Sequence, residues 1–203
     1  MSVASTPGVN YFDSLFTQSD DPWHFKTRWY EKRKRALTVA CLPAQRYGSI
    51  FEPGCANGEL SAALAPRCDR LLIADGSAKA VALARQRVAA WPHAEVRLGW
   101  MPEAWPDECF DLIVISEVAY YLDAGQLHVL IERVRASLRP GGTVLACHWR
   151  QQIDGCVLNG DTVHAALQAG LTMPRWSKHT ELDFRLDLWC RDLRSVAESE
   201  GFV

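Results

Sequence analysis

Residues 49–60 read Ser49-Ile50-Phe51-Glu52-Pro53-Gly54-Cys55-Ala56-Asn57-Gly58-Glu59-Leu60 and predict a short buried strand, a turn and the start of a helix. The turn depends on Gly54 and Gly58, because glycine adopts positive φ without strain and lets a ligand come close to the backbone. The helix is expected to begin at Glu59. In an open α/β sheet, such a junction of strand, glycine turn and helix binds a nucleotide-like molecule.

The spacing of the glycines disfavours a dinucleotide as that molecule. The dinucleotide-binding fingerprint has glycine at the first, third and sixth positions of G-x-G-x-x-G, and counted from Gly54 these positions hold Gly54, Ala56 and Glu59. The anionic Glu59 would also stand where that fold receives a pyrophosphate. No Gly-Lys-Ser/Thr follows, so a phosphate loop is disfavoured as well.

Length and composition predict one soluble globular domain over residues 1–203. A chain of 203 residues buries roughly 70% of the surface that its unfolded form exposes, which suits a single core. The hydrophobic fraction is 48%, the charged fraction 23% and the net charge −2. Because there is no basic excess, a nucleic-acid partner is disfavoured.

The absence of a recognisable targeting signal and the pattern of cysteines predict a cytoplasmic location. Residues 1–10 lack a basic end followed by an apolar core, and no later apolar run approaches the ~18 residues of a membrane span, so no membrane insertion is expected. Seven cysteines occur without a C-x-x-C pair, which predicts free thiols in a reducing compartment and no metal site. We expect a monomer or a weak dimer.

Hydrophobic spacing predicts five strand–helix units that end in a hairpin. After the first strand, strands are expected over 70–75, 94–98, 110–116, 143–149, 176–182 and 184–191, and helices over 27–40, 59–65, 78–90, 124–138 and 161–169. The last two strands are too close for a crossover, so they must be antiparallel. Residues 1–22 are expected to form an irregular arm that lies, with the helix after it, over the ligand edge of the sheet.

Asp75 is the second residue that points to a nucleoside ligand. It ends the second predicted strand, where open α/β folds place a carboxylate that holds ribose hydroxyls. An aspartate before a helix is otherwise common as a helix cap. Because the glycine turn also points to a ligand, ribose binding is the favoured interpretation of Asp75.

The stretch from Glu52 to Gly58 resembles motif I of the class I S-adenosylmethionine-dependent methyltransferases, an acidic residue followed by G-x-G-x-G, with Ala56 in place of the central glycine. Three further segments narrow the resemblance to nodulation protein S and its relatives: residues 21–23, 30–34 and 110–122. These proteins N-methylate the deacetylated glucosamine end of a chitin-type oligosaccharide. The likeness covers roughly residues 15–150.

The resemblance implies a Rossmann-like class I methyltransferase fold of the α/β class, with a seven-stranded, mostly parallel sheet, a C-terminal antiparallel hairpin strand and helices on both faces. It also implies an N-terminal arm and cap helix over 1–45, a cofactor-binding core over 46–150, and an acceptor-side loop, helix and hairpin over 151–203. The cofactor would be S-adenosylmethionine and the product S-adenosylhomocysteine.

The resemblance also assigns residues to the cofactor. The methionine part is assigned to Glu52, Gly54, Cys55, Ala56, Asn57 and Gly58; the ribose hydroxyls to Asp75 with Gly76 and Ser77 beside it; the region near the sulfonium to Ser116, Glu117 and Val118. Upstream, Trp23 and Tyr30 are expected at the same site, and Arg33 is expected to face the cofactor carboxylate.

The adenine contact departs from the family pattern. Trp100 stands where the family has an aspartate for the adenine amino group. Three alternatives are open: Trp100 stacks on the base, Met101 supplies a backbone N–H, or the pocket has a different shape.

Two titratable residues end adjacent central strands and are candidates for catalysis. Glu117 and His148 should face one crevice, because ligands bind outside the carboxyl ends of the strands. Either could accept a proton from an amine directly or through one water. Alternatively, positioning supplies most of the acceleration, or His148 only hydrogen-bonds a backbone carbonyl.

The predicted activity is methyl transfer from S-adenosylmethionine to the amine of an amino sugar or saccharide. Eight tryptophans are many for this length, and their flat faces pack well against sugar rings, although core packing also explains some of them. The alternatives are a small-molecule O-methyltransferase, a nicotinamide-dependent oxidoreductase and a non-catalytic cofactor-binding subunit.

Overall fold

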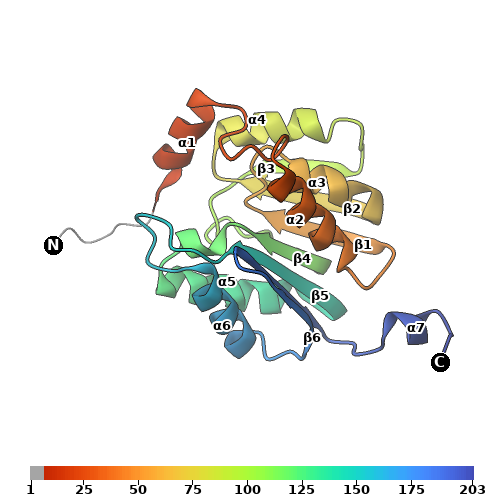
Figure 1. The fold of residues 1–203 in the computed structure, drawn as a ribbon. Coiled ribbons are helices and arrows are strands. Elements are labelled where there is room, and N and C mark those ends of the chain that lie inside the picture. Colours follow the sequence, from red (N-terminus) through yellow and green to blue (C-terminus); the bar gives the residue numbers. More distant parts are fainter. Residues whose placement is uncertain (1–6) are drawn as a thin grey trace.

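The computed structural model describes residues 7–203 and contains one seven-stranded sheet with helices on both faces (Figure 1). The strand order is β3-β2-β1-β4-β5-β7-β6, and the antiparallel pairings are those of β7 with β5 and with β6. The strands are β1 (Tyr47–Pro53), β2 (Cys68–Asp75), β3 (Ala94–Leu98), β4 (Phe110–Ser116), β5 (Leu138–Trp149), β6 (Arg175–Thr180) and β7 (Phe184–Cys190). The predicted parallel sheet and its C-terminal hairpin are both confirmed.

The helices divide the core between the two faces of the sheet. One face packs against α2 (Trp29–Ala40), α3 (Glu59–Leu64) and α4 (Ala78–Arg87), and the other against α5 (Ala124–Ser137) and α6 (Gly160–Gly170). In β1, Ile50 and Phe51 are both fully buried and belong to opposite cores. Burial of side chains of this size contributes ~1.5–3 kcal/mol each, which explains why the central strands are apolar on both faces.

The N-terminal segment differs from the irregular arm that the sequence predicted. It contains α1 (Val9–Gln18), and its buried or half-buried residues Val9, Phe12, Leu15 and Phe16 follow helical spacing. Ser77 donates a hydrogen bond to Asp13, which ties α1 to the start of α4. The expectation that this segment and α2 lie over the ligand edge is confirmed by the residues that line the cavity described below.

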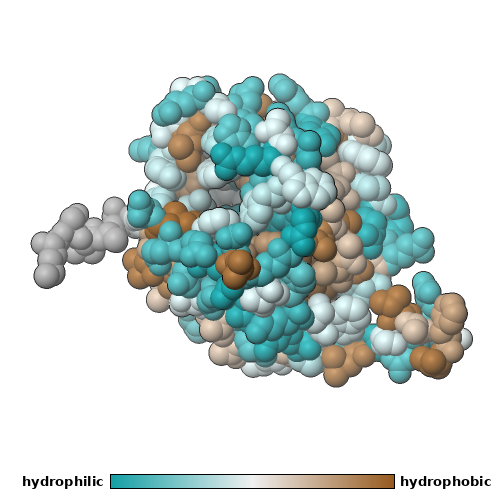
Figure 2. All heavy atoms as spheres, in the orientation of Figure 1, coloured by the Kyte–Doolittle hydropathy of each residue, from teal (hydrophilic) through white to brown (hydrophobic). Residues whose placement is uncertain are grey.

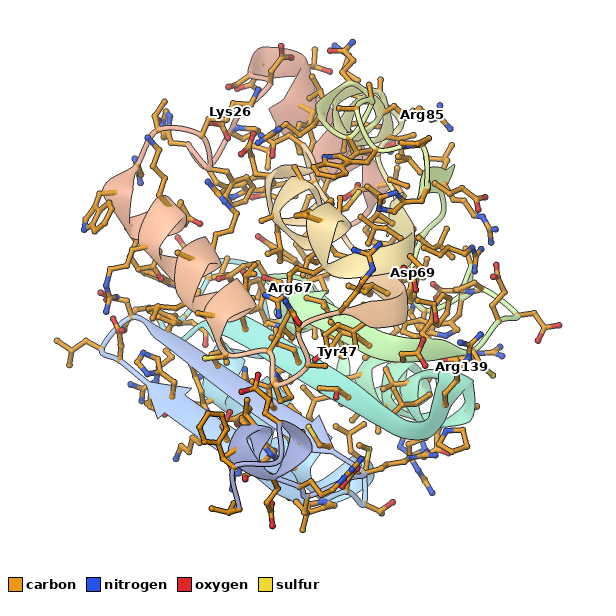
Figure 3. The ribbon with its side chains drawn as sticks, turned by 90° about the vertical axis from the view of Figure 1, so that its right-hand side faces the viewer. Lys26, Tyr47, Arg67, Asp69, Arg85 and Arg139 are labelled. Carbon is orange, nitrogen blue, oxygen red and sulfur yellow. The ribbon has the colours of Figure 1, made fainter. Side chains whose placement is uncertain are left out.

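At the amino-terminal ends of β1 and β2, the side chain of Arg67 binds backbone carbonyl groups. Its guanidinium donates to the carbonyl oxygens of Val39 (3.3 Å), Ala44 (2.7 Å) and Gln45 (2.7 Å), which fixes the connection between α2 and β1 (Figure 3). Among residues 7–203, no helix has the combination of length and apolar composition needed to cross a membrane. All seven cysteines are free thiols.

Candidate active site

A cavity of about 620 Å³ lies at the carboxyl ends of β1, β2, β4 and β5. Figure 2 shows the surface hollowed on this side of the molecule, below α1 and α4. The aromatic residues of α1 and the following loop, Tyr11, Phe12, Phe16, Trp23 and Phe25, form one part of its wall. The turn between β1 and α3 forms another part of the wall.

The turn after β1 has three residues with positive φ. Gly54 has φ +72° and Gly58 φ +80°, as expected for glycine, but Ala56 also has φ +49°. A side chain at residue 54 would place its Cβ 2.7 Å from the side chain of Val118. Gly54 is therefore required by conformation and by space, whereas Ala56 carries backbone strain at the edge of the cavity.

Glu52 presents a buried carboxylate to the cavity. The residue is 3% exposed, and Oε2 accepts a hydrogen bond from Ser61 Oγ at 2.6 Å. Burial raises the pKa of Glu52 to about 8; the Ser61 hydrogen bond lowers it and the charge of Asp75 raises it. A cationic group of a ligand would favour the ionised form of this buried carboxyl and lower its pKa.

Asp75 lines the same cavity and is held by backbone donors. Oδ2 accepts from Ala56 N and Oδ1 from Ser77 N, each at 2.9 Å. Burial raises the pKa of Asp75, and these two hydrogen bonds oppose the shift. The carboxylates of Glu52 and Asp75 thus flank the glycine turn from two neighbouring strands.

Trp100 forms a flat wall beside Asp75. It packs so closely against Gly76 that a Cβ there would lie 2.2 Å from its ring. The ring also contacts Phe12 of α1, with the two centroids 5.9 Å apart. Met101 lies next to it on the cavity wall.

The other end of the cavity holds a cluster of charged residues around Lys34. Its Nζ donates to Glu117 Oε1 at 2.6 Å and lies 3.1 Å from Glu31 Oε2. Burial opposes the charge of Lys34, but Glu117 and Glu31 outweigh it and raise the pKa of Lys34 above its ordinary value. Burial raises the pKa of Glu31.

Glu117 is held in a strained conformation. Its φ is +56°, and its Oε2 accepts hydrogen bonds from Trp149 N at 3.0 Å and from the Tyr120 hydroxyl. With Lys34, three donors therefore occupy the two carboxylate oxygens. Non-glycine residues with positive φ cost about 1–3 kcal/mol and cluster at functional sites.

Two buried polar atoms on the cavity wall have no hydrogen-bond partner within residues 7–203. They are the hydroxyl oxygen of Tyr30 and Oδ1 of Asn57. The amide of Asn57 is oriented by its other end, since Nδ2 donates to Asp20 O at 3.2 Å and to Asp21 Oδ1 at 3.0 Å. Unpartnered buried polar atoms are costly, so this wall fits a ligand with polar groups.

The chain matches a known protein family over most of its length. The sequence profile of the family described as Nodulation protein S (NodS) matches residues 14–173, well over half of the chain. The chain belongs to the NodS family. Nodulation protein S of Bradyrhizobium diazoefficiens is 33% identical over 138 residues, which are 66% of this chain and 65% of that protein. The protein of the same name from Rhizobium tropici is 31% identical over 73% of this chain.

This NodS-family chain spans about 65% of the length of those curated relatives. Among solved structures, N-methyltransferase NodS of Bradyrhizobium japonicum in complex with S-adenosyl-L-homocysteine has a TM-score of 0.81 at 26% identity, over 90% of this chain and 97% of that one. A protein of Pseudomonas syringae assigned to the methyltransferases is 57% identical over 81% of this chain and all of that one, with a TM-score of 0.73. The predicted class I methyltransferase fold is thereby confirmed.

Most of the residues expected at the site of this NodS-family chain lie on the cavity wall. They are Trp23, Tyr30, Glu52, Gly54, Cys55, Ala56, Asn57, Asp75, Gly76, Trp100, Met101, Ser116, Glu117 and Val118. Four expected residues lie outside it: Arg33, Gly58, Ser77 and His148. Gly58 and Ser77 adjoin the wall and shape it, because Gly58 precedes α3 with φ +80° and Ser77 caps α4.

The expectation for Arg33 is wrong. Its guanidinium forms two hydrogen bonds with Glu181, at 2.7 and 2.8 Å, on the loop between β6 and β7. The cations of α2 that line the cavity are the next two residues, Lys34 and Arg35. Successive residues of a helix differ in direction by about 100°, so the choice of residue within the basic run decides which one faces the ligand.

The expectation that His148 faces the crevice is also wrong. The residue is fully buried, and its Nε2 accepts a hydrogen bond from Ala119 N at 3.3 Å. The next residue of β5, Trp149, lines the cavity. Because side chains alternate along a strand, the direction of His148 follows from that of Trp149.

Sequence reasoning missed Glu31, Lys34 and the aromatic face of α1. Lys34 is 6% exposed, although it stands in a run of four basic residues from Lys32 to Arg35. Two signals were available: Glu31 and Lys34 have the spacing of a helical ion pair, and α1 has apolar residues at helical spacing.

Proposed function

We propose that this chain is an S-adenosylmethionine-dependent methyltransferase whose acceptor is the amine of an amino sugar or small saccharide. The observation that carries the proposal is the pair of carboxylates, buried Glu52 and half-buried Asp75, on one cavity beside the glycine turn. The relative of known structure that binds S-adenosyl-L-homocysteine has the same fold and is an N-methyltransferase.

The cofactor end of the cavity fits a nucleoside that carries an amino acid. Glu52 would accept hydrogen bonds from the ligand's ammonium and Asp75 from its ribose hydroxyls. Asn57 Oδ1, which is buried without a partner in the described chain, would accept from a further donor of the ligand. Trp100 would lie flat against the adenine, and Met101 would close that side. When bound, S-adenosylmethionine supplies an electrophilic methyl group on its sulfonium.

The acceptor end fits a cationic amine attached to a ring. Glu31 and Glu117 both contact the ammonium of Lys34, and no other cationic side chain of the described residues forms an ion pair with either carboxylate, so a further cation can be held beside them. Tyr30 and Trp149 present aromatic surfaces there, with their centroids 5.7 Å apart, and such surfaces pack against sugar rings.

The amine must lose a proton before its nitrogen can attack a methyl carbon. The raised pKa of Glu31 favours this carboxylate as the proton acceptor, directly or through one water. Glu117, whose oxygens already receive three hydrogen bonds, would orient the amine from the strained turn after β4. Alignment of the nitrogen with the breaking carbon–sulfur bond supplies much of the acceleration.

Two experiments test this proposal. Calorimetry should show binding of S-adenosylhomocysteine and none of NAD; the reverse would refute the proposal. Transfer of a labelled methyl group should then be measured onto deacetylated chitooligosaccharides, simple amines and the matching hydroxyl-bearing saccharides. Transfer to the hydroxyl compounds alone would replace the amine acceptor by an O-methylated one.

A further inference from the structure

Three buried residues outside the cavity form a hydrogen-bonded row behind its acceptor end. His148 of β5, His164 of α6 and Asp187 of β7 are all fully buried, and none of them lines the cavity. His148 Nδ1 lies 3.1 Å from His164 Nε2, and His164 Nδ1 lies 3.0 Å from Asp187 Oδ2. Arg185 holds the far end, with Nε 2.9 Å from the same Asp187 oxygen.

The position of each proton in this row follows from its first donor. Ala119 N–H can only donate, so His148 Nε2, its partner at 3.3 Å, carries no proton. A neutral His148 then carries its proton on Nδ1 and donates to His164 Nε2. His164 in turn carries its proton on Nδ1 and donates to Asp187, so one arrangement satisfies every bond.

The row ends on the turn that shapes the acceptor end. Ala119 lies two residues after the strained Glu117 and begins the 3₁₀ turn η2 (Ala119–Tyr121). Tyr120 of this turn donates to Glu117 and packs its ring edge-on against His148, with the centroids 5.4 Å apart. A positive φ at Glu117 is strained, so this conformation persists only while neighbouring residues such as Ala119 and Tyr120 are held in place.

We infer that His148, His164 and Asp187 form a buried positioning row that holds residues 117–121 in the shape required by the acceptor amine. This inference rests on the proposed function. The three residues act through Ala119 and Tyr120 and do not touch the ligand cavity, so they position the turn and take no part in proton transfer to the acceptor.

Acid should break this row. A second proton on His148 would sit on Nε2 and face Ala119 N–H, and a second proton on His164 would sit on Nε2 and face His148 Nδ1–H. The His164 end is surrounded by Asp187 and Arg185 of β7, Arg175 of β6 and Asp161 of α6. The His148 side faces Lys34 of α2 and Tyr120 of η2. Burial, the largest cause, lowers the pKa of both histidines.

The tautomers can be tested without any ligand or activity. Ring ¹⁵N–¹H spectra of the labelled full chain should show His148 and His164 as neutral Nδ1–H tautomers, and both should titrate below the ordinary value for histidine. The His148→Gln and His164→Gln chains assign the two signals. An Nε2–H tautomer at His148, or titration of either ring near the ordinary value of about 6.5, would overturn the inference.

Variants of His148 separate positioning from a general structural role. His148→Leu removes the acceptor for Ala119 N–H, and kcat for the amine should fall about 10- to 100-fold, as expected for a misplaced turn, while the Kd for S-adenosylhomocysteine stays within about two-fold. His148→Gln places an amide oxygen near the former Nε2 and should restore most of the rate. The control is His128→Leu, on the exposed face of α5.

An unchanged kcat in His148→Leu, or equal losses in the Leu and Gln variants, would overturn the inference. If the Leu variant does not fold, the Gln variant and the tautomers of the native chain still decide the matter. Failure of the proposed function would appear separately, as native protein that does not bind S-adenosylhomocysteine although the tautomers are as stated.

Discussion

The two ends of the cavity are built in different ways. The cofactor end consists of residues 52–58 and 75–77, two short segments that follow neighbouring parallel strands. The acceptor end joins α2, the turn after β4 and the end of β5, and behind it lie α6 and β7. One end therefore depends on local backbone geometry, and the other on side chains that are far apart in the sequence.

This difference predicts how substitutions should separate binding from catalysis. Changes at the cofactor end should alter ligand affinity with small effects on the fold. Changes at the acceptor end should alter stability and turnover together, because its charges are buried and shared among several elements.

The largest effect is expected from Lys34→Met. This change removes the only ammonium that both Glu31 and Glu117 contact among the described residues, and loss of one partner of a buried ion pair costs about 3–5 kcal/mol. Urea unfolding should show this loss in the free energy of unfolding. Lys32→Met, on the exposed side of the same helix, is the matched control and should differ from the native chain by less than about 0.5 kcal/mol. Similar small changes in both variants would show that the Lys34 cluster is not a buried charged centre.

Glu52→Gln is expected to raise the free energy of unfolding at pH 8, which is opposite in sign to the effect of Lys34→Met. The pKa of Glu52 in the folded chain, about 8, lies above the ordinary value of 4.5, so the folded chain binds more protons than the unfolded chain between these values. Native stability should therefore fall as pH rises from 4.5 to 8, by at most about 1.4 kcal/mol for each pH unit from this group.

The Glu52→Gln chain should lack this part of the pH dependence and be more stable than the native chain at pH 8, while it binds S-adenosylhomocysteine more weakly. Urea unfolding at several pH values and calorimetry measure both quantities. A variant that is less stable than the native chain at pH 8 would contradict the prediction.

An intermediate effect is expected from Asp75→Asn. The amide keeps the shape of the side chain but loses the charge and one of the two acceptor oxygens. Hydrogen bonds to charged groups contribute about 1.5–3 kcal/mol, so affinity for S-adenosylhomocysteine should fall about 10- to 100-fold. Calorimetry measures this change. Asp107→Asn changes an exposed carboxylate and should leave the affinity intact. An unchanged dissociation constant in Asp75→Asn would remove this residue from the ribose site.

The smallest effect is expected from Ala56→Gly. Glycine adopts the φ of +49° without strain, which should stabilise the turn by about 1 kcal/mol, partly offset by the larger backbone entropy that glycine loses on folding. Thermal unfolding and calorimetry should show changes of this size or less. A loss of affinity of ten-fold or more would show that the methyl group of Ala56 itself contacts the ligand.

The sequence predicted the cofactor end well because its signals are local. The apolar strands, the glycine spacing and Asp75 each depend on a few consecutive residues, and Glu52, Gly54 and Asp75 lie together on the wall of one cavity. The helix α1 was missed because its apolar spacing is short and was interpreted as part of an irregular arm.

The acceptor end was predicted less well for a geometric reason. Arg33 and Lys34 differ by one helical step, and His148 and Trp149 by one position in a strand. In both pairs the sequence identified the region but not the side chain that faces the cavity. That choice depends on Glu181, His164 and Asp187, which are more than ten residues away along the chain and become neighbours only in the folded protein.

The most direct test of the central claim is a calorimetric titration of the native chain with S-adenosylhomocysteine and, separately, with NAD. If Glu52 and Asp75 hold the ammonium and the ribose of a nucleoside that carries an amino acid, S-adenosylhomocysteine should bind and NAD should give no heat of binding. Binding of NAD without binding of S-adenosylhomocysteine would contradict the account.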